Sequence, residues 1–147
     1  MKRPNGHALS YGDLHEHLGY VLRQAQLAGF DAFRRAAVRP DMTPARYSAM
    51  VIVKSNPGLT QSALGAALGT ARSGAMTMVD WLEEQGLAER RKLAHDARAW
   101  GLYLTPRGDA KLRILNRKVR ANDARFAGRL SRAEQATLKS LLAKLSG

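Results

Sequence analysis

Positions 90–98 combine several cations with one carboxylate, and their spacing suits contact with a phosphate-rich partner. The group consists of Arg90, Arg91, Lys92, His95, Asp96 and Arg98. A turn at His95-Asp96 between two short strands, at about residues 88–93 and 99–104, would place these side chains on a β-hairpin. Cations on such a hairpin can enter a narrow minor groove of DNA or lie on its phosphates. Asp96 can hold the Arg98 guanidinium in a bidentate pair or tie down the turn.

A second polar group lies on the helix expected from about residue 70 to residue 85. On a helical wheel, the side expected to face the core contains Ala75, Met78, Val79 and Leu82. The opposite side contains Ser73, Thr77 and Asp80, with Arg72, Met76 and Trp81 beside them. Arginine can read guanine, hydroxyls can bind bases or phosphates, and methionine can meet a thymine methyl group. The residues expected to contact duplex DNA are therefore Thr70, Arg72, Ser73, Met76 and Thr77.

These two groups must be positioned by a mainly helical chain. Apolar residues recur every three or four positions from about residue 13 to residue 38, which predicts one long first helix. Thr43-Pro44 is typical of a helix start, and the helix that follows should end near Lys54. Thr60 and Thr70 are expected to cap two short helices joined by a tight turn, which predicts a helix-turn-helix.

The rest of the chain predicts a hairpin and two further helices. Gly86 is a good stop for the helix before the hairpin. Thr105-Pro106 opens a fifth helix, and Ser131 with Glu134 forms a capping box at the start of a last one. The expected fold class is therefore mainly α with a small β-wing, a winged helix-turn-helix with additional terminal helices.

The chain has 147 residues and a formal net charge of +12, and the positive excess is concentrated after residue 85. Residues 86–120 contain ten basic and three acidic residues, whereas residues 1–85 contain nine and seven. Because a compact protein this basic usually meets a polyanion, the charge favours nucleic acid or an anionic membrane as partner. No stretch approaches the length of a membrane span.

No residues with an enzyme's or a metal site's spacing stand out. Cysteine is absent, which excludes disulfides and thiolate metal sites and fits a reducing compartment. On a helix His15 and His17 point in nearly opposite directions, so they cannot share a metal ion. There is no glycine-rich phosphate loop, nucleophile elbow or HExxH motif. The N-terminus lacks the apolar run of a signal peptide. We expect a cytoplasmic protein that is not an enzyme and has no cofactor or metal.

The terminal helices have apolar stripes that the winged region is too small to cover. The stripes contain Leu112, Leu115, Val119 and Phe126 in the fifth helix and Leu138, Leu141, Leu142 and Leu145 in the last one. The simplest way to bury them is against each other and against a second subunit, so we predict a homodimer. Residues 13–42 and 106–147 would form the dimerisation region, and residues 43–105 the winged lobe.

The sequence resembles the MarR family of bacterial transcription regulators over about residues 14–147. The resemblance rests on Leu59-Thr60-Gln61, on residues 82–90, on Asp96-Ala97-Arg98 and on Leu104-Thr105-Pro106-Arg107-Gly108. It implies a triangular homodimer whose first, fifth and sixth helices build the interface, with the fourth as recognition helix. Such proteins typically repress genes by binding a pseudo-palindromic operator, and a small molecule releases them. By position, Arg98 would be the minor-groove residue and Asp96 its partner.

In such dimers the effector pocket usually lies between the dimerisation helices and the DNA-binding lobe. The residues with suitable chemistry there are His17, Tyr20, Arg46, Tyr47 and Met50. Aromatic walls with one cation suit an aromatic carboxylate. The arginines at the end of the first helix, Arg34, Arg35 and Arg39, could receive the phosphates of an acyl-CoA thioester. The alternatives are ordinary core residues for Tyr47 and Met50, a surface position for Arg46, and a solvated helix end for Arg34, Arg35 and Arg39.

We therefore predict a sequence-specific transcriptional repressor that a small-molecule effector, an aromatic carboxylate or its acyl-CoA thioester, releases from DNA. A non-specific architectural DNA-binding protein is the alternative, and steep salt dependence with little sequence discrimination would identify it. A winged helix that binds an acidic protein is a third reading, which a lack of duplex binding at low salt would favour.

Overall fold

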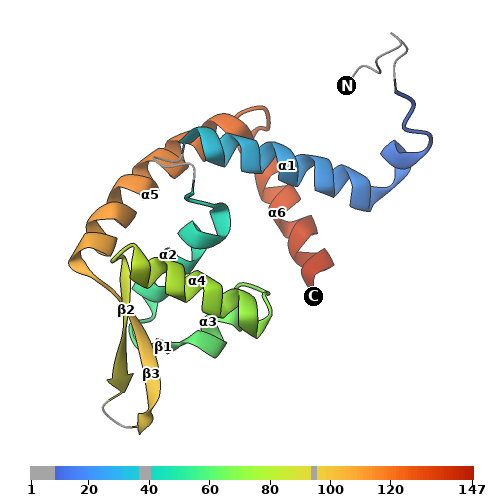
Figure 1. The fold of residues 1–147 in the computed structure, drawn as a ribbon. Coiled ribbons are helices and arrows are strands. Elements are labelled where there is room, and N and C mark those ends of the chain that lie inside the picture. The colour runs from blue at the N-terminus through green and yellow to red at the C-terminus, as the bar shows by residue number, and fades with distance from the viewer. Residues whose placement is uncertain (1–8, 37–40, 94–95) are drawn as a thin grey trace.

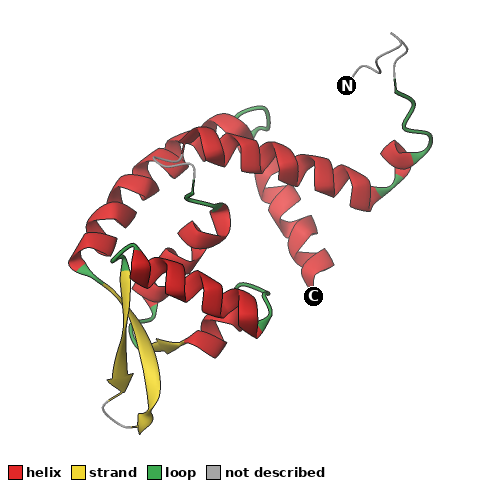
Figure 2. Cartoon of the chain, viewed as in Figure 1, coloured by secondary structure: helices red, strands yellow, loops and turns green. Residues whose placement is uncertain are grey.

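A computed structural model of the chain describes residues 9–36, 41–93 and 96–147, and for residues 96–98 it describes the backbone alone. The described chain is mainly helical, with a small antiparallel sheet at one end (Figure 1, Figure 2). In chain order the elements are η1 (Leu14–Glu16), α1 (Leu18–Ala36), α2 (Pro44–Ser55), β1 (Leu59–Thr60), α3 (Gln61–Ala67), α4 (Arg72–Glu84), β2 (Ala88–Leu93), β3 (Asp96–Leu104), α5 (Pro106–Ala127) and α6 (Arg132–Ser146).

The hydrophobic core lies where α2, α3, α4 and the sheet meet the first half of α5. Its fully buried side chains include Met50, Leu64, Leu82, Leu102 and Leu115. Ala75, Val79 and Leu82 are the buried residues of α4, which confirms the core side predicted for this helix. Because each of these elements contributes to one cluster, the two short helices and the wing are held in a fixed arrangement.

The sheet has the order β1-β3-β2, with both outer strands antiparallel to β3. The bounds of β2 agree with the prediction, while β3 begins three residues earlier than expected and the two-residue strand β1 was not predicted. Gly101 on β3 allows β1 to pair with this strand, because a Cβ at Gly101 would lie only 2.8 Å from the Cα atom of Gly58. Leu59 pairs with Leu102 and Thr60 with Gly101, which ties the start of α3 to the wing.

Side-chain caps begin four of the helices where the sequence predicted them. Thr43, Thr60, Thr105 and Ser131 each accept a hydrogen bond from the backbone N–H three residues later. At Ser131 the capping box is complete, because the Glu134 carboxylate accepts a hydrogen bond from the Ser131 N–H in return. These boundaries are set locally, so the sequence alone determines them.

The predicted cap at Thr70 is wrong. Helix α4 begins at Arg72 after Ala71, which offers no side-chain cap. Gly69 has a left-handed φ of 61°, and the Thr70 N–H donates to the carbonyl of Gly65, so the turn extends one residue further before the helix starts. The Thr70 hydroxyl instead lies over Gly74, in the space that a Cβ at that position would fill. Gly74 therefore makes room for the turn.

The prediction of one helix over residues 13–38 is also wrong at its start. Residues 14–16 form the short 3-10 helix η1, and His17 has an extended backbone (φ −85°, ψ 119°) before α1 begins at Leu18. The His17 N–H donates to the carbonyl of Leu14, three residues earlier, which closes a 3-10 turn in place of an α-helical one. Helix α1 is described up to Ala36, and residues 37 and 38 lie outside the described part of the chain.

The terminal helices extend away from the lobe. Helix α1 lies along the second half of α5, where the ring of Phe126 is 3.7 Å from the position that a Cβ would take at Gly29, and α6 projects from the end of α5 (Figure 1). Within α1 the buried residues are Ala32 and Phe33. The four leucines of α6, at positions 138, 141, 142 and 145, are 37–60% exposed in the single chain. Among the described helices, none is long and apolar enough to cross a membrane.

Candidate DNA-binding surface and effector residues

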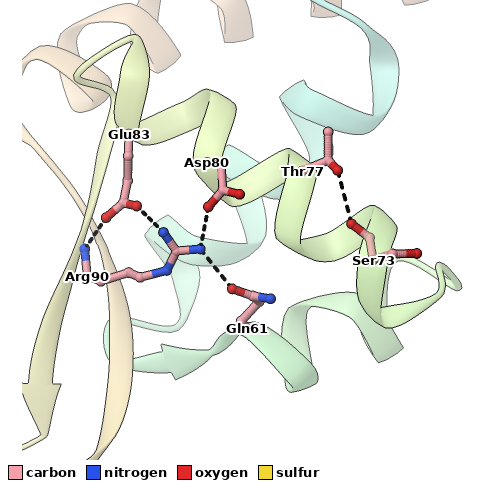
Figure 3. A network of polar contacts seen from close by, with 6 residues as sticks. All are labelled: Gln61, Ser73, Thr77, Asp80, Glu83 and Arg90. Carbon is pink, nitrogen blue, oxygen red and sulfur yellow. Dashed lines mark hydrogen bonds and ion pairs between the residues drawn. The ribbon is translucent and has the colours of Figure 1, made fainter.

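Helix α4 presents a polar, solvent-exposed face. Arg72, Ser73, Met76 and Thr77 are all exposed, and Met76 is 50% accessible. The Thr77 hydroxyl donates to the Ser73 carbonyl one turn earlier, at 3.1 Å (Figure 3). Thr70, which precedes the helix, is half-buried against Gly74. The helix therefore offers one cation, small hydroxyls and a flexible apolar side chain on the side opposite the core, a combination suited to reading base edges.

Arg90 on β2 does not point away from the lobe, as expected for a DNA contact, but toward α4 and α3 (Figure 3). Its guanidinium donates to Asp80 at 2.8 Å and to Gln61 at 2.9 Å, and it also pairs with Glu83. The Arg90 backbone N–H donates to the same Glu83 carboxylate at 2.9 Å. Only 25% of the Arg90 side chain is exposed. In the described structure Arg90 therefore holds the wing against α4, and its expected contact with DNA stays a prediction.

Arg91 and Lys92, the next two cations of β2, lie on opposite faces of the ribbon. Arg91 pairs with Glu89 and lies over the ring of Tyr103, with 5.0 Å from the guanidinium carbon to the ring centre. Lys92 pairs in register with Trp100, whose ring centre is 5.9 Å from the lysine nitrogen. Both cations are exposed, and both retain freedom to meet a phosphate because their aromatic contacts are at the surface.

The tip of the wing lies only partly within the described residues. His95 lies outside them, and for Asp96 and Arg98 the backbone alone is described, in strand β3. Asp96 is the register partner of Leu93, with an irregularity between Lys92 and Leu93. The expected pairing of Asp96 with Arg98 therefore remains a prediction.

The residues expected to line an effector pocket do not come together within one chain. Tyr20, half-buried in the first turn of α1, packs against His15, with 5.2 Å between ring centres, and His17, exposed just before α1, pairs with Asp13. The Tyr47 hydroxyl donates to Asn116 on α5 at 2.9 Å. The other two residues lie elsewhere: the guanidinium of Arg46 is 3.9 Å from the ring centre of Trp81, and Met50 is fully buried in the core.

The arginines at the end of α1 differ from one another. Arg34 pairs with Asp31 on the same helix. Arg35 lines a cleft between α1 and α5, and Arg39 lies outside the described residues. Among the described residues, Arg34 and Arg35 therefore do not form one basic cluster, because Arg34 is paired and Arg35 is not.

Sequence reasoning missed the acceptors that hold Arg90. Gln61 was noted only for the resemblance, and Asp80 was placed on the face expected to meet DNA. The periodicity of α4 gave one signal, because Asp80 and Glu83 are three residues apart and share a face. Within the described residues, no group of three histidine or acidic side chains is placed to hold a metal ion.

Comparison with known proteins places this geometry in context. The sequence model described as "MarR family" matches residues 41–99, which contain α2, α3, α4, β2 and the start of β3. A putative transcriptional regulatory protein for the hcr operon of Thauera aromatica is 38% identical over 138 residues, which cover 93% of this chain and 83% of that protein.

Solved structures agree with the whole described fold. The transcriptional repressor CouR bound to a 23-mer DNA duplex superposes with a TM-score of 0.88 and 33% identity, covering 96% of this chain and 100% of that one. CouR bound to p-coumaroyl-CoA gives a TM-score of 0.86 at 33% identity, over 95% of this chain and 98% of that one.

Proposed function

Because this chain belongs to the MarR family of DNA-binding transcriptional regulators, we propose that it is a homodimeric repressor whose operator complex is dissolved by an aromatic effector. The observation that carries the proposal is the exposed polar face of α4 beside a wing that Arg90 locks to the same helix. The recognition helix would enter the major groove, and the wing would lie along the neighbouring minor groove.

Within this proposal, the DNA contacts are divided between two elements. Arg72 and Met76 would read base edges, and Ser73 and Thr77 would contact bases or phosphates. On the wing, Lys92 and Arg91 would meet phosphates, and Arg98 with its partner Asp96 would act in the minor groove. The relative CouR has been solved on a 23-mer DNA duplex, which supports binding to duplex DNA.

A second subunit would complete the molecule. Residues 13–42 and 106–147 would form the dimerisation region around the lobe of residues 43–105. The exposed leucines of α6 support this division, because four large apolar side chains on one helix face need a partner surface. Two lobes related by a two-fold axis would match a pseudo-palindromic operator.

The effector would be an aromatic carboxylate or its coenzyme A thioester. The support is the relative CouR, solved with p-coumaroyl-CoA. Tyr47, bonded to Asn116 between α2 and α5, lies where a ligand would touch both the lobe and the dimerisation region. Tyr20 and His17 at the start of α1 would reach such a ligand only from the partner subunit.

Binding to duplex DNA tests the proposal. The full chain would be titrated with DNA from its own promoter region and with a scrambled duplex of equal length, at near-physiological salt. We expect preference for the promoter of about a thousandfold or more, and release on addition of p-coumaroyl-CoA or p-coumarate. Equal affinity for both duplexes would support an architectural DNA-binding protein instead.

A further inference from the structure

A cleft of about 690 Å³ lies between α1 and the second half of α5. Its two walls come from residues 28–36 and 118–129, which Figure 1 shows running side by side. Volumes of this order are typical of sites for small molecules and cofactors. The cleft includes none of the residues that the sequence predicted for an aromatic carboxylate, but it does include Arg35, which was expected to receive the phosphates of an acyl-CoA thioester.

Four cations surround this cleft without an internal counter-charge. They are Arg35 on α1, Lys118 and Arg125 on α5, and Arg129 just after α5. All four are exposed, and none forms an ion pair with another described residue. The one acidic side chain in the lining, Asp31, pairs with Arg34. The cleft is therefore a concave surface with uncompensated positive charge, which attracts an anion with several charges.

The wall also contains an exposed ring. Phe126 on α5 is 43% accessible and lies against Gly29 of α1, whose Cβ position is 3.7 Å from the ring. The ring therefore lies close to α1 and still keeps an open surface. An aromatic surface beside arginines is the combination on which a nucleobase stacks while its phosphates are neutralised.

Two other occupants fit this cleft less well. DNA held by the wing would lie at the other end of the molecule, since Figure 1 shows the wing and the α1–α5 pair at opposite ends. A second copy of this chain has a different surface to cover, the apolar stripe of α6, and none of the leucines of that stripe lines the cleft.

We propose that the cleft binds the nucleotide part of an acyl-CoA effector, with the cations on its phosphates and Phe126 against the adenine. This inference rests on the proposed function, because it specifies the thioester as the form of effector recognised. Arg35, Arg125 and Arg129 can each form paired hydrogen bonds to phosphate oxygens, and Lys118 adds a point charge. The acyl group would then be free to extend from the cleft toward the partner subunit or the lobe.

The test is calorimetric binding of coenzyme A, p-coumaroyl-CoA, ADP and p-coumarate to the full-length protein without DNA. The cleft variant carries Lys118→Ala and Arg125→Ala, and the matched control carries Arg117→Ala and Arg120→Ala. The control removes the same number of charges from exposed positions of α5 that do not line the cleft. We expect the cleft variant to bind coenzyme A and p-coumaroyl-CoA about tenfold or more weakly. The control and wild type should bind them alike, and p-coumarate should bind all three proteins equally.

A second variant tests the aromatic surface. Phe126→Leu should weaken ADP and coenzyme A binding but leave pyrophosphate binding unchanged, because stacking needs the base. Equal loss in the Arg117/Arg120 control would mean that coenzyme A responds to overall charge and would overturn the site. Unchanged coenzyme A affinity in the Lys118/Arg125 variant would overturn the site too. Dissociation of the dimer in that variant would also overturn it, because the cleft would then be a contact surface for a second copy.

The two proposals fail in different ways. If promoter DNA is bound specifically but coenzyme A is not bound, the regulator stands and the cleft assignment fails. If coenzyme A is bound through the cleft while promoter and scrambled DNA are bound alike, the cleft assignment stands and the operator-specific function fails.

Discussion

In residues 43–105 the apolar side chains of α2, α3, α4 and the sheet bury one another, whereas the leucines of α6 stay 37–60% exposed. The polar groups differ in the same way. Arg90 joins β2, α3 and α4 through its side chain, while the cations around the α1–α5 cleft have no acidic partner among the described residues. The lobe is thus complete within one chain, and the terminal helices are not. We infer that the lobe is a rigid unit by itself, whereas the terminal helices need other molecules to cover their exposed apolar and charged surfaces.

The largest effect on operator affinity should come from substitutions that stop a second subunit from packing on the exposed apolar face of α6. Leu141→Glu together with Leu145→Glu places charge in the apolar stripe and should convert the dimer to a monomer. Operator affinity should fall by about a hundredfold or more, because two linked half-site contacts become one. Light scattering after size exclusion gives the mass, and fluorescence anisotropy with labelled operator gives the affinity.

The matched control is Ser140→Glu, which introduces the same residue on the opposite side of α6. It should leave the mass and the affinity unchanged. A double leucine variant that stays dimeric and binds normally would mean that the stripe is not the interface.

The next largest effect concerns the tip of the wing. Arg98→Ala should reduce operator affinity by about tenfold to a hundredfold, because it removes the proposed minor-groove cation. The melting temperature and the dimer should not change. Arg117→Ala on α5 is the control for loss of one surface charge. Unchanged affinity in Arg98→Ala would remove the wing tip from the DNA interface.

Variants of Arg90 test whether this side chain positions the wing or contacts DNA directly. Arg90→Gln should lower the free energy of unfolding by about 2 kcal/mol, because the carboxylates of Asp80 and Glu83 lose a charged donor. It should also weaken operator binding without changing the slope of log K against log salt concentration. Lys92→Gln should reduce that slope by about 0.9, as expected for a phosphate contact.

A thermodynamic cycle sharpens the Arg90 prediction. If Arg90 acts by placing the wing, Arg90→Gln should cost less operator affinity in an Arg98→Ala background than in the wild type. Full additivity together with a reduced salt slope would instead make Arg90 a direct DNA contact, as the sequence had suggested.

The features that the sequence predicted correctly are set by residues close together in the chain. The caps at Thr43, Thr60, Thr105 and Ser131 depend on residues three positions apart, so a linear reading found them. Strand β2 was likewise found from alternation and turn residues.

The errors arise where distant residues decide. Gln61, which accepts a hydrogen bond from Arg90, is 29 residues away in sequence, so the reversal of that side chain toward the lobe needs the tertiary structure. Strand β1 exists only because Gly58 and Gly101 approach closely. The effector residues were chosen by type, and in one chain they lie in separate surroundings, so their common role stays a prediction.

The helix caps at Thr105 and Ser131 differ in what they hold together: one lies at the lobe and the other at the exposed start of α6. The Thr105 hydroxyl donates to the Gly86 carbonyl at 2.7 Å and accepts from the Gly108 N–H, so it fastens α5 to the lobe. Thr105→Ala should destabilise the protein by about 1–2 kcal/mol in urea unfolding. Ser131→Ala, at an exposed cap with no long-range bond, should cost less. Equal losses would mean that α6 unfolds together with the lobe.

The smallest expected effect is a difference in acid sensitivity between two carboxylates. The hydrogen bond from Lys54, aided by the charges of Lys54 and Arg113, lowers the pKa of Asp109, which lies where α5 meets the lobe. Hydrogen bonds from the Ser131 backbone and side chain lower the pKa of Glu134 at the start of α6. Since both folded-state pKa values lie below the unfolded ones, each contribution to stability is present above the unfolded pKa and is lost as the pH falls through the folded pKa.

Tryptophan fluorescence can assign each loss to its region, because both tryptophans, Trp81 and Trp100, lie in the lobe. Below about pH 4, near the usual carboxylate range, Asp109→Asn should flatten the acid-induced change that fluorescence detects. Glu134→Gln should leave that change intact and flatten only the loss of helical circular dichroism. If Glu134→Gln altered the tryptophan signal as strongly as Asp109→Asn, α6 would be coupled to the lobe, and the separation between a complete lobe and unfinished terminal helices would not hold.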